Sequence, residues 1–97
     1  MYAKPVRRIS VELYSAPECS LCGPVETLLS RVADELGLDV QKFDITQDSA
    51  LEARFRTEIP VVFLDGRKAY KYRVDEAELR RRVERLRDAR DPREATE

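Results

Sequence analysis

The sequence predicts an α/β fold with one mixed four-stranded sheet and helices packed on it, because the spacing of its apolar residues changes along the chain. Residues 7–15 alternate apolar and polar side chains as a strand does, with Ile9, Val11 and Leu13 on one face. Between residues 21 and 36, beginning at Leu21, apolar residues instead recur every three or four positions, as on one face of a helix. A chain of 97 residues has room for one domain, which we place at residues 1–90, followed by a flexible C-terminal tail at 91–97.

The remaining elements are predicted from the same patterns and from capping residues. Gly37 stands where the first helix needs a C-cap, and Asp75 and Glu78 have the spacing of a capping box at the start of the last helix. In chain order we expect a strand at 38–46, a short helix capped by Asp48, a buried strand at 61–64, a hairpin turn at Asp65 and Gly66, a strand at 68–72, and a helix to about Arg90.

Composition and charge argue against several classes of function. Hydrophobic residues make up 42% and charged residues 38%, a balance typical of soluble globular proteins. The net charge is −1, and the arginine-rich segment at 75–91 carries equal numbers of acids and arginines, so no basic field points to nucleic acid or an anionic membrane. No apolar run has the length of a signal peptide or a bilayer span. We therefore expect a cytoplasmic monomer with neither nucleic acid nor membrane as a partner.

The two cysteines of the chain, Cys19 and Cys22, are separated by two residues and lie where the first strand passes into the first helix. The positive end of a helix dipole and the unpaired N–H groups there favour a thiolate. Residues three apart on one helical turn lie about 5–6 Å apart, a separation that a disulfide can span. We predict that Cys19 is the more exposed, attacking thiolate and that Cys22 is more buried and resolves the mixed disulfide.

Other interpretations of the cysteine pair stay open. Structural zinc takes four ligands, and the sequence has no histidine and no third cysteine, so we expect no metal site within one chain. A metal or cluster shared between two chains, or a pair of inert buried thiols, are the alternatives.

The residues that flank the cysteines complicate the simple dithiol. The carboxylate of Glu18 opposes thiolate formation at Cys19. We expect the helix to begin near Ser20 with an irregular first turn, because Leu21 fits the apolar stripe, although the ring of Pro24 then crowds the Ser20 carbonyl. If Pro24 is instead the first helical residue, the cysteines lie in a loop and the effect of the dipole weakens.

The segments "VELYSAPECSLC", "EIPVVFLDGR" and "DEAELRRRV" resemble the thioredoxin superfamily and, within it, the small glutaredoxin-like proteins whose members read Cys-[His/Ser]-Leu-Cys. The resemblance covers about Ile9 to Leu86. It implies a thioredoxin-like fold of the order β-α-β-α-β-β-α, and a thiol–disulfide oxidoreductase that reduces or exchanges disulfides through Cys19 and Cys22. A binding module of the same fold with a redox-sensitive but non-catalytic dithiol is the alternative.

The resemblance also implies how substrates bind. It predicts a cis Ile59–Pro60 bond that leaves the backbone of Ile59 free to pair with an extended substrate or with the peptide part of glutathione. It places Asp75 where the family meets the glutamyl end of glutathione. Two departures bear on function: Leu13 stands where thioredoxins have a buried aspartate as proton relay, and Arg73 and Val74 replace a glycine pair that is usual in glutathione-binding members.

The same resemblance implies no permanently bound cofactor, with glutathione as a candidate co-substrate. The expected partner is a disulfide-containing protein or glutathione, and the expected electron donor is glutathione or a flavoprotein reductase.

Overall fold

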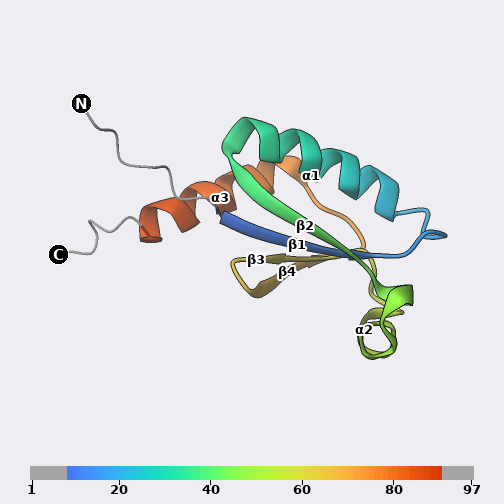
Figure 1. The fold of residues 1–97 in the computed structure, drawn as a ribbon. Coiled ribbons are helices and arrows are strands. Elements are labelled where there is room, and N and C mark those ends of the chain that lie inside the picture. Colours follow the sequence, from blue (N-terminus) through green and yellow to red (C-terminus); the bar gives the residue numbers. More distant parts are fainter. Residues whose placement is uncertain (1–8, 91–97) are drawn as a thin grey trace.

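The computed structural model describes residues 9–90, so the tail predicted at 91–97 and the first eight residues of the predicted domain lie outside the described part. The elements in chain order are β1 (Ile9–Ser15), α1 (Cys22–Leu36), β2 (Leu38–Asp44), a 3-10 turn η1 (Ile45–Gln47), α2 (Ser49–Phe55), β3 (Val61–Leu64), β4 (Arg67–Lys71) and α3 (Glu76–Arg90). The strands form one sheet in the order β2-β1-β3-β4 (Figure 1). Because β1 is parallel to β2 and antiparallel to β3, the predicted mixed four-stranded sheet is confirmed.

One face of the sheet packs against α1 and α3. The alternation in β1 turns Ile9, Val11 and Leu13 to this face, where each is fully buried, as predicted. The helices contribute their apolar stripes, which are Val25, Leu29 and Val32 from α1 and Leu79 and Val83 from α3. This cluster is the main core, and it holds α1 in place behind the dithiol.

The other face of the sheet is covered by α2 at one end, as Figure 1 shows. Tyr14 lies at the centre of this second cluster, with its ring centroid 5.0 Å from that of Phe43, 4.7 Å from that of Phe55 and 5.5 Å from that of Phe63. Phe55 is the buried residue that α2 supplies. The aromatic cluster therefore fastens α2, and the chain that follows it, to the end of the sheet where β1 enters the dithiol loop.

The predicted caps are present. Gly37 has a φ of 75°, and its N–H donates to the carbonyl of Ala33 at 2.8 Å, which closes α1. The carboxylate of Asp48 accepts two backbone N–H groups at the start of α2. Asp75 accepts the N–H of Glu78 at 3.2 Å, but the second half of the capping box is not formed, because the carboxylate of Glu78 accepts the Tyr70 hydroxyl instead.

Two strand boundaries differ from prediction. The second strand ends at Asp44 rather than at residue 46, because the Asp44 carboxylate accepts the N–H and the hydroxyl of Thr46 and turns the chain into η1. The last strand covers Arg67–Lys71 rather than 68–72. The hairpin turn itself is as predicted, with Asp65 and Gly66 both at positive φ, 51° and 84°, as a two-residue turn between antiparallel strands requires.

Ion pairs join α3 to α1. Arg31 of α1 donates two hydrogen bonds of 2.8 Å to the carboxylate of Glu76, at the first position of α3. Arg80 contacts Glu76 and also Glu35 of α1. At the C-terminal end of α1, Arg87 donates to the carbonyls of Leu36 and Gly37, where a cation complements the helix dipole. None of the helices within residues 9–90 is long and apolar enough to cross a membrane.

Candidate redox site

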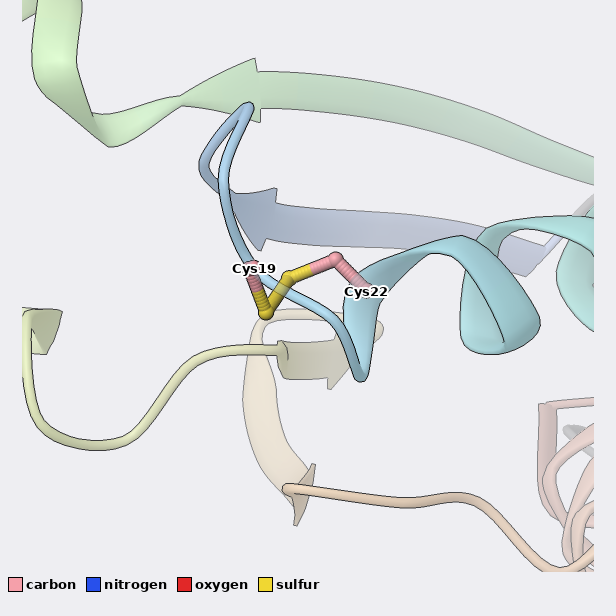
Figure 2. Close-up of a disulfide and its surroundings, with 2 residues drawn as sticks. All are labelled: Cys19 and Cys22. Carbon is pink, nitrogen blue, oxygen red and sulfur yellow. A yellow bond between two sulfur atoms is a disulfide. The ribbon is translucent and has the colours of Figure 1, made fainter.

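Cys19 and Cys22 are joined by a disulfide at the point where the β1–α1 loop enters α1 (Figure 2). Their Cα atoms are 5.4 Å apart, within the predicted range. Cys22 is 4% exposed, whereas Cys19 is half-buried. The predicted difference in exposure between the two residues is confirmed; their roles as attacking and resolving thiols stay predictions.

The start of α1 differs from the prediction. The helix begins at Cys22 with Leu21 as its N-cap, two residues after the start predicted near Ser20 and two residues before Pro24. Before it, the Cys22 N–H donates to the carbonyl of Cys19 at 3.3 Å, so Cys19 lies in a turn just outside the helix. Pro24 is then the third helical residue, a position whose N–H has no partner within a helix, so its missing N–H costs no hydrogen bond. Its ring also crowds no helical carbonyl, because residue 20, four positions earlier, precedes the helix.

Leu21 does not belong to the apolar stripe of α1, contrary to the prediction. Its side chain is 46% exposed, because residue 21 precedes the first helical turn and the three-to-four-residue period does not yet apply. An exposed apolar side chain therefore stands between the two cysteines in the sequence.

The segment Ile59–Pro60 lies at the same end of the sheet as the dithiol. Val61 pairs with Tyr14, so the antiparallel direction brings Pro60 and Ile59 level with the end of β1 and the start of the dithiol loop, and Ile59 packs in the same cluster as Ala16. The chain leading into β3 passes just below Cys19 in the view of Figure 2. The Ile59–Pro60 peptide bond is cis, Pro60 is buried, and its carbonyl accepts the N–H of Tyr72 at 2.9 Å.

Asp75 stands apart from the dithiol in its contacts. It caps α3, and its neighbour Glu76 binds Arg31, which is nine residues after Cys22. At 1.5 Å per residue, nine residues correspond to about 13 Å along the helix axis. No contact described within residues 9–90 joins Asp75 to either cysteine, and its glutamyl-binding role stays a prediction.

A cavity of about 400 Å³ opens beside the dithiol, on the side of β2. It is lined by both cysteines, by the loop residues Ser15, Ala16 and Pro17, by Gly23 and Glu26 of α1, and by Lys42, Phe43 and Asp44 of β2. Lys42 and Glu26 form an ion pair at this cavity, and hydrogen bonds from the hydroxyl and backbone N–H of Thr46 hold the pKa of Asp44 below its usual value.

Sequence reasoning missed Glu26 and Lys42. The spacing of four between Cys22 and Glu26 could have identified Glu26, because residues four apart lie on one helix face. Lys42 gave no such signal, since it is 16 residues from Glu26 on a different element.

Tyr14, five residues before Cys19, belongs to the aromatic cluster and is absent from the lining of the cavity. Burial raises the pKa of its phenol, and the nearby carboxylate of Glu12 adds to the effect. Within residues 9–90, no group of three or more histidine, cysteine, aspartate or glutamate side chains is placed to hold a metal ion.

Comparisons with known proteins place these features in context. The glutaredoxin-like domain family (DUF836) matches residues 10–84. Uncharacterised proteins of Mycobacterium tuberculosis (strain H37Rv) and Mycobacterium bovis are each 36% identical over 83 residues, covering 80% of this chain and 86% of theirs.

Solved structures of similar fold include two structural-genomics targets and a thioredoxin. A protein of Xanthomonas campestris ("X. campestris" target XcR50) has a TM-score of 0.64 at 25% identity, covering 77% of this chain and 96% of its own. A Nitrosomonas europaea protein has a TM-score of 0.68 at 16% identity, covering 84% of this chain and 98% of its own. Fasciola hepatica thioredoxin has a TM-score of 0.58 at 24% identity, covering 80% of each chain. The last two similarities concern the fold alone.

Proposed function

Since the chain belongs to the glutaredoxin-like (DUF836) family of the thioredoxin superfamily, we propose that it is a thiol–disulfide oxidoreductase that reduces or exchanges disulfides through Cys19 and Cys22. The observation that carries the proposal is the disulfide at the N-terminus of α1, between a half-buried and a buried cysteine. A structural cross-link would add little here, because the bridge closes a loop of only three residues in an already hydrogen-bonded turn.

The reaction follows from this arrangement. In the reduced protein the Cys19 thiolate attacks a substrate disulfide, forms a mixed disulfide and releases the first substrate thiol. Cys22 then attacks the Sγ atom of Cys19, releases the second thiol and leaves the Cys19–Cys22 disulfide, so the dithiol supplies both electrons. Glutathione or a flavoprotein reductase returns the protein to the dithiol. The first helical turn starts at Cys22, and its unpaired N–H groups stabilise the negative charge of a cysteine thiolate at this end of α1.

The surroundings of the dithiol suit an extended, partly apolar substrate. Ile59 has neither its N–H nor its carbonyl in a hydrogen bond to another of the described residues, so both are free for strand addition. Leu21 and Tyr72, 46% and 43% exposed, offer apolar contacts, and Tyr72 is joined to Pro60 by a backbone hydrogen bond. A disulfide-containing protein is therefore the expected substrate, with glutathione as co-substrate or electron donor.

The test is the reduction of insulin disulfides with glutathione, or with thioredoxin reductase and its nicotinamide cofactor, as the electron donor. We expect turnover by the wild type, none by Cys19→Ser, and a trapped mixed disulfide on Cys19 in Cys22→Ser. Ser20→Ala, an exposed change in the same turn, is the control and should keep the activity. Preferred alkylation of Cys22 before Cys19 would contradict the assigned roles, and absence of turnover with every donor would contradict the enzyme.

The exposed Leu21 and Tyr72 also favour a second function, a protein-binding module whose dithiol is only a redox-sensitive latch. Such a module would bind its partner equally well as Cys19→Ser and would show no turnover. Affinity capture followed by a binding assay with Cys19→Ser separates the two functions.

A further inference from the structure

The buried cysteine of the dithiol must lose a proton before it can attack. Cys22 is 4% exposed, so its thiol has little contact with bulk water that could take the proton. Leu13, which stands in the sequence where thioredoxins have a buried aspartate as proton relay, is an apolar residue fully buried in the main core. The proton of Cys22 therefore needs another acceptor.

The cavity on the β2 side of the dithiol contains such an acceptor. Both cysteines line it, together with Glu26, and its volume of about 400 Å³ has room for several water molecules. Glu26 lies one helical turn after Cys22, and residues four apart share one face of a helix, so both side chains border the same cavity. Lys42 of β2 pairs with this carboxylate at the edge of the cavity.

The other charged groups near the cavity are less suited to this role. Asp44 also lines the cavity, but its Oδ1 atom is held by the N–H of Thr46 at 2.9 Å and by the Thr46 hydroxyl at 2.6 Å, in the turn that ends β2. Glu18 precedes Cys19 in the loop, is exposed and does not line the cavity. The ammonium group of Lys42 donates hydrogen bonds and has no acceptor atom.

We infer that Glu26, acting through water in this cavity, accepts the proton of the Cys22 thiol when Cys22 resolves the mixed disulfide; the inference rests on the proposed function. The Cys22 thiol gives its proton to the Glu26 carboxylate, and the resulting thiolate attacks the Sγ atom of Cys19. The bond between Cys19 and the substrate sulfur breaks, and the substrate leaves as a thiolate that takes up a proton from Glu26 or from solvent. The two cysteines supply the two electrons that reduce the substrate disulfide, and the proton taken from Cys22 is returned to the substrate thiolate or to solvent.

The two chemical steps can be observed separately by mixing reduced protein with a symmetrical aromatic disulfide whose thiolate product is coloured. Attack by Cys19 releases a first equivalent of colour, and attack by Cys22 releases a second, so stopped-flow absorbance gives one phase for each cysteine. The aromatic thiolate leaves without needing a proton, so the second phase depends on the ionisation of Cys22. The variant is Glu26→Gln, and the matched control is Asp34→Asn, which removes one exposed carboxylate from the same helix.

We expect Glu26→Gln to slow the second phase at pH 7 by about tenfold to a hundredfold and to leave the first phase nearly unchanged. A positioned general base contributes about a hundredfold to ten-thousandfold, so the expected effect reaches the lower end of that range. The difference from the wild type should shrink as the pH rises past the usual thiol pKa of about 8.5, because hydroxide can then take the proton of a thiol directly. Asp34→Asn should follow the wild type at every pH.

The sign of the effect separates this role from a merely electrostatic one. Removing a negative charge near a thiol favours the thiolate, so a Glu26 that acts only by its charge would make the second phase faster in Glu26→Gln. A faster or unchanged second phase would overturn the inference, as would a slowing that is equal at all pH values or is shared by Asp34→Asn. A wild type that releases only one equivalent would instead contradict the proposed function.

Discussion

Replacing Phe55 with alanine should remove a large part of the free energy of unfolding, because this one side chain fastens α2 to the sheet. Phe55 is 2% exposed and lies between the rings of Tyr14, at 4.7 Å, and Phe63, at 5.9 Å. Truncation of a buried phenylalanine costs about 3–5 kcal/mol, and two lost aromatic pairs favour the upper half of that range. Domains of this size have free energies of unfolding of about 5–15 kcal/mol, so we expect a loss of about 4 kcal/mol.

Urea unfolding followed by far-ultraviolet circular dichroism measures this loss as a lower midpoint at an unchanged slope. Phe55→Leu keeps most of the buried volume but loses both ring pairs, so it should cost about 1–3 kcal/mol, and it remains measurable if the alanine variant does not fold. Leu21→Ala is the control, since a 46% exposed leucine should change the stability by no more than about 0.5 kcal/mol. A cost below about 1 kcal/mol for Phe55→Ala would refute the packing argument.

Three further predictions concern caps and charge. Asp48→Ala should lower the free energy of unfolding by about 1 kcal/mol through loss of the α2 cap, and Asp48→Asn should restore most of it in the same urea assay. Gly37→Ala should cost about 1 kcal/mol or more, because its φ of 75° strains any residue with a Cβ atom; equal midpoints for both proteins would disprove this. Arg31 and Arg80 lower the pKa of Glu76 from 4.5 to about 2. The contribution of Glu76 to the free energy of unfolding is therefore complete above pH 4.5 and is lost as the pH falls toward 2. In acid unfolding experiments, the stability of Glu76→Gln should depend less on pH between these two values than that of the wild type.

Much of the geometry of the cysteine pair could be predicted from the local sequence. The spacing of three residues predicted the Cα separation, and the position relative to the helix predicted that Cys22 is the more buried residue. Both depend on the backbone geometry of a few neighbouring residues, although Cys19 lies in a turn just outside the helix. The place of Leu21 was predicted wrongly: it was assigned to the apolar stripe, but it precedes the helix and is 46% exposed.

The sequence by itself determined the elements whose causes are local. Alternation placed Ile9, Val11 and Leu13 on the core face, and Gly37 and Asp48 marked helix ends, because backbone conformation and capping depend on neighbours a few residues away.

Only the tertiary structure decided which side chains from different elements meet. The parallel register of β1 and β2 and the packing of α1 bring Lys42 to Glu26 beside the dithiol, and the same packing sets Glu76 against the middle of α1. Such contacts depend on how whole helices and strands settle on the sheet, and no spacing within the sequence encodes them. The acceptor proposed for the Cys22 proton is therefore visible in the fold, while the dithiol it serves is already visible in the sequence.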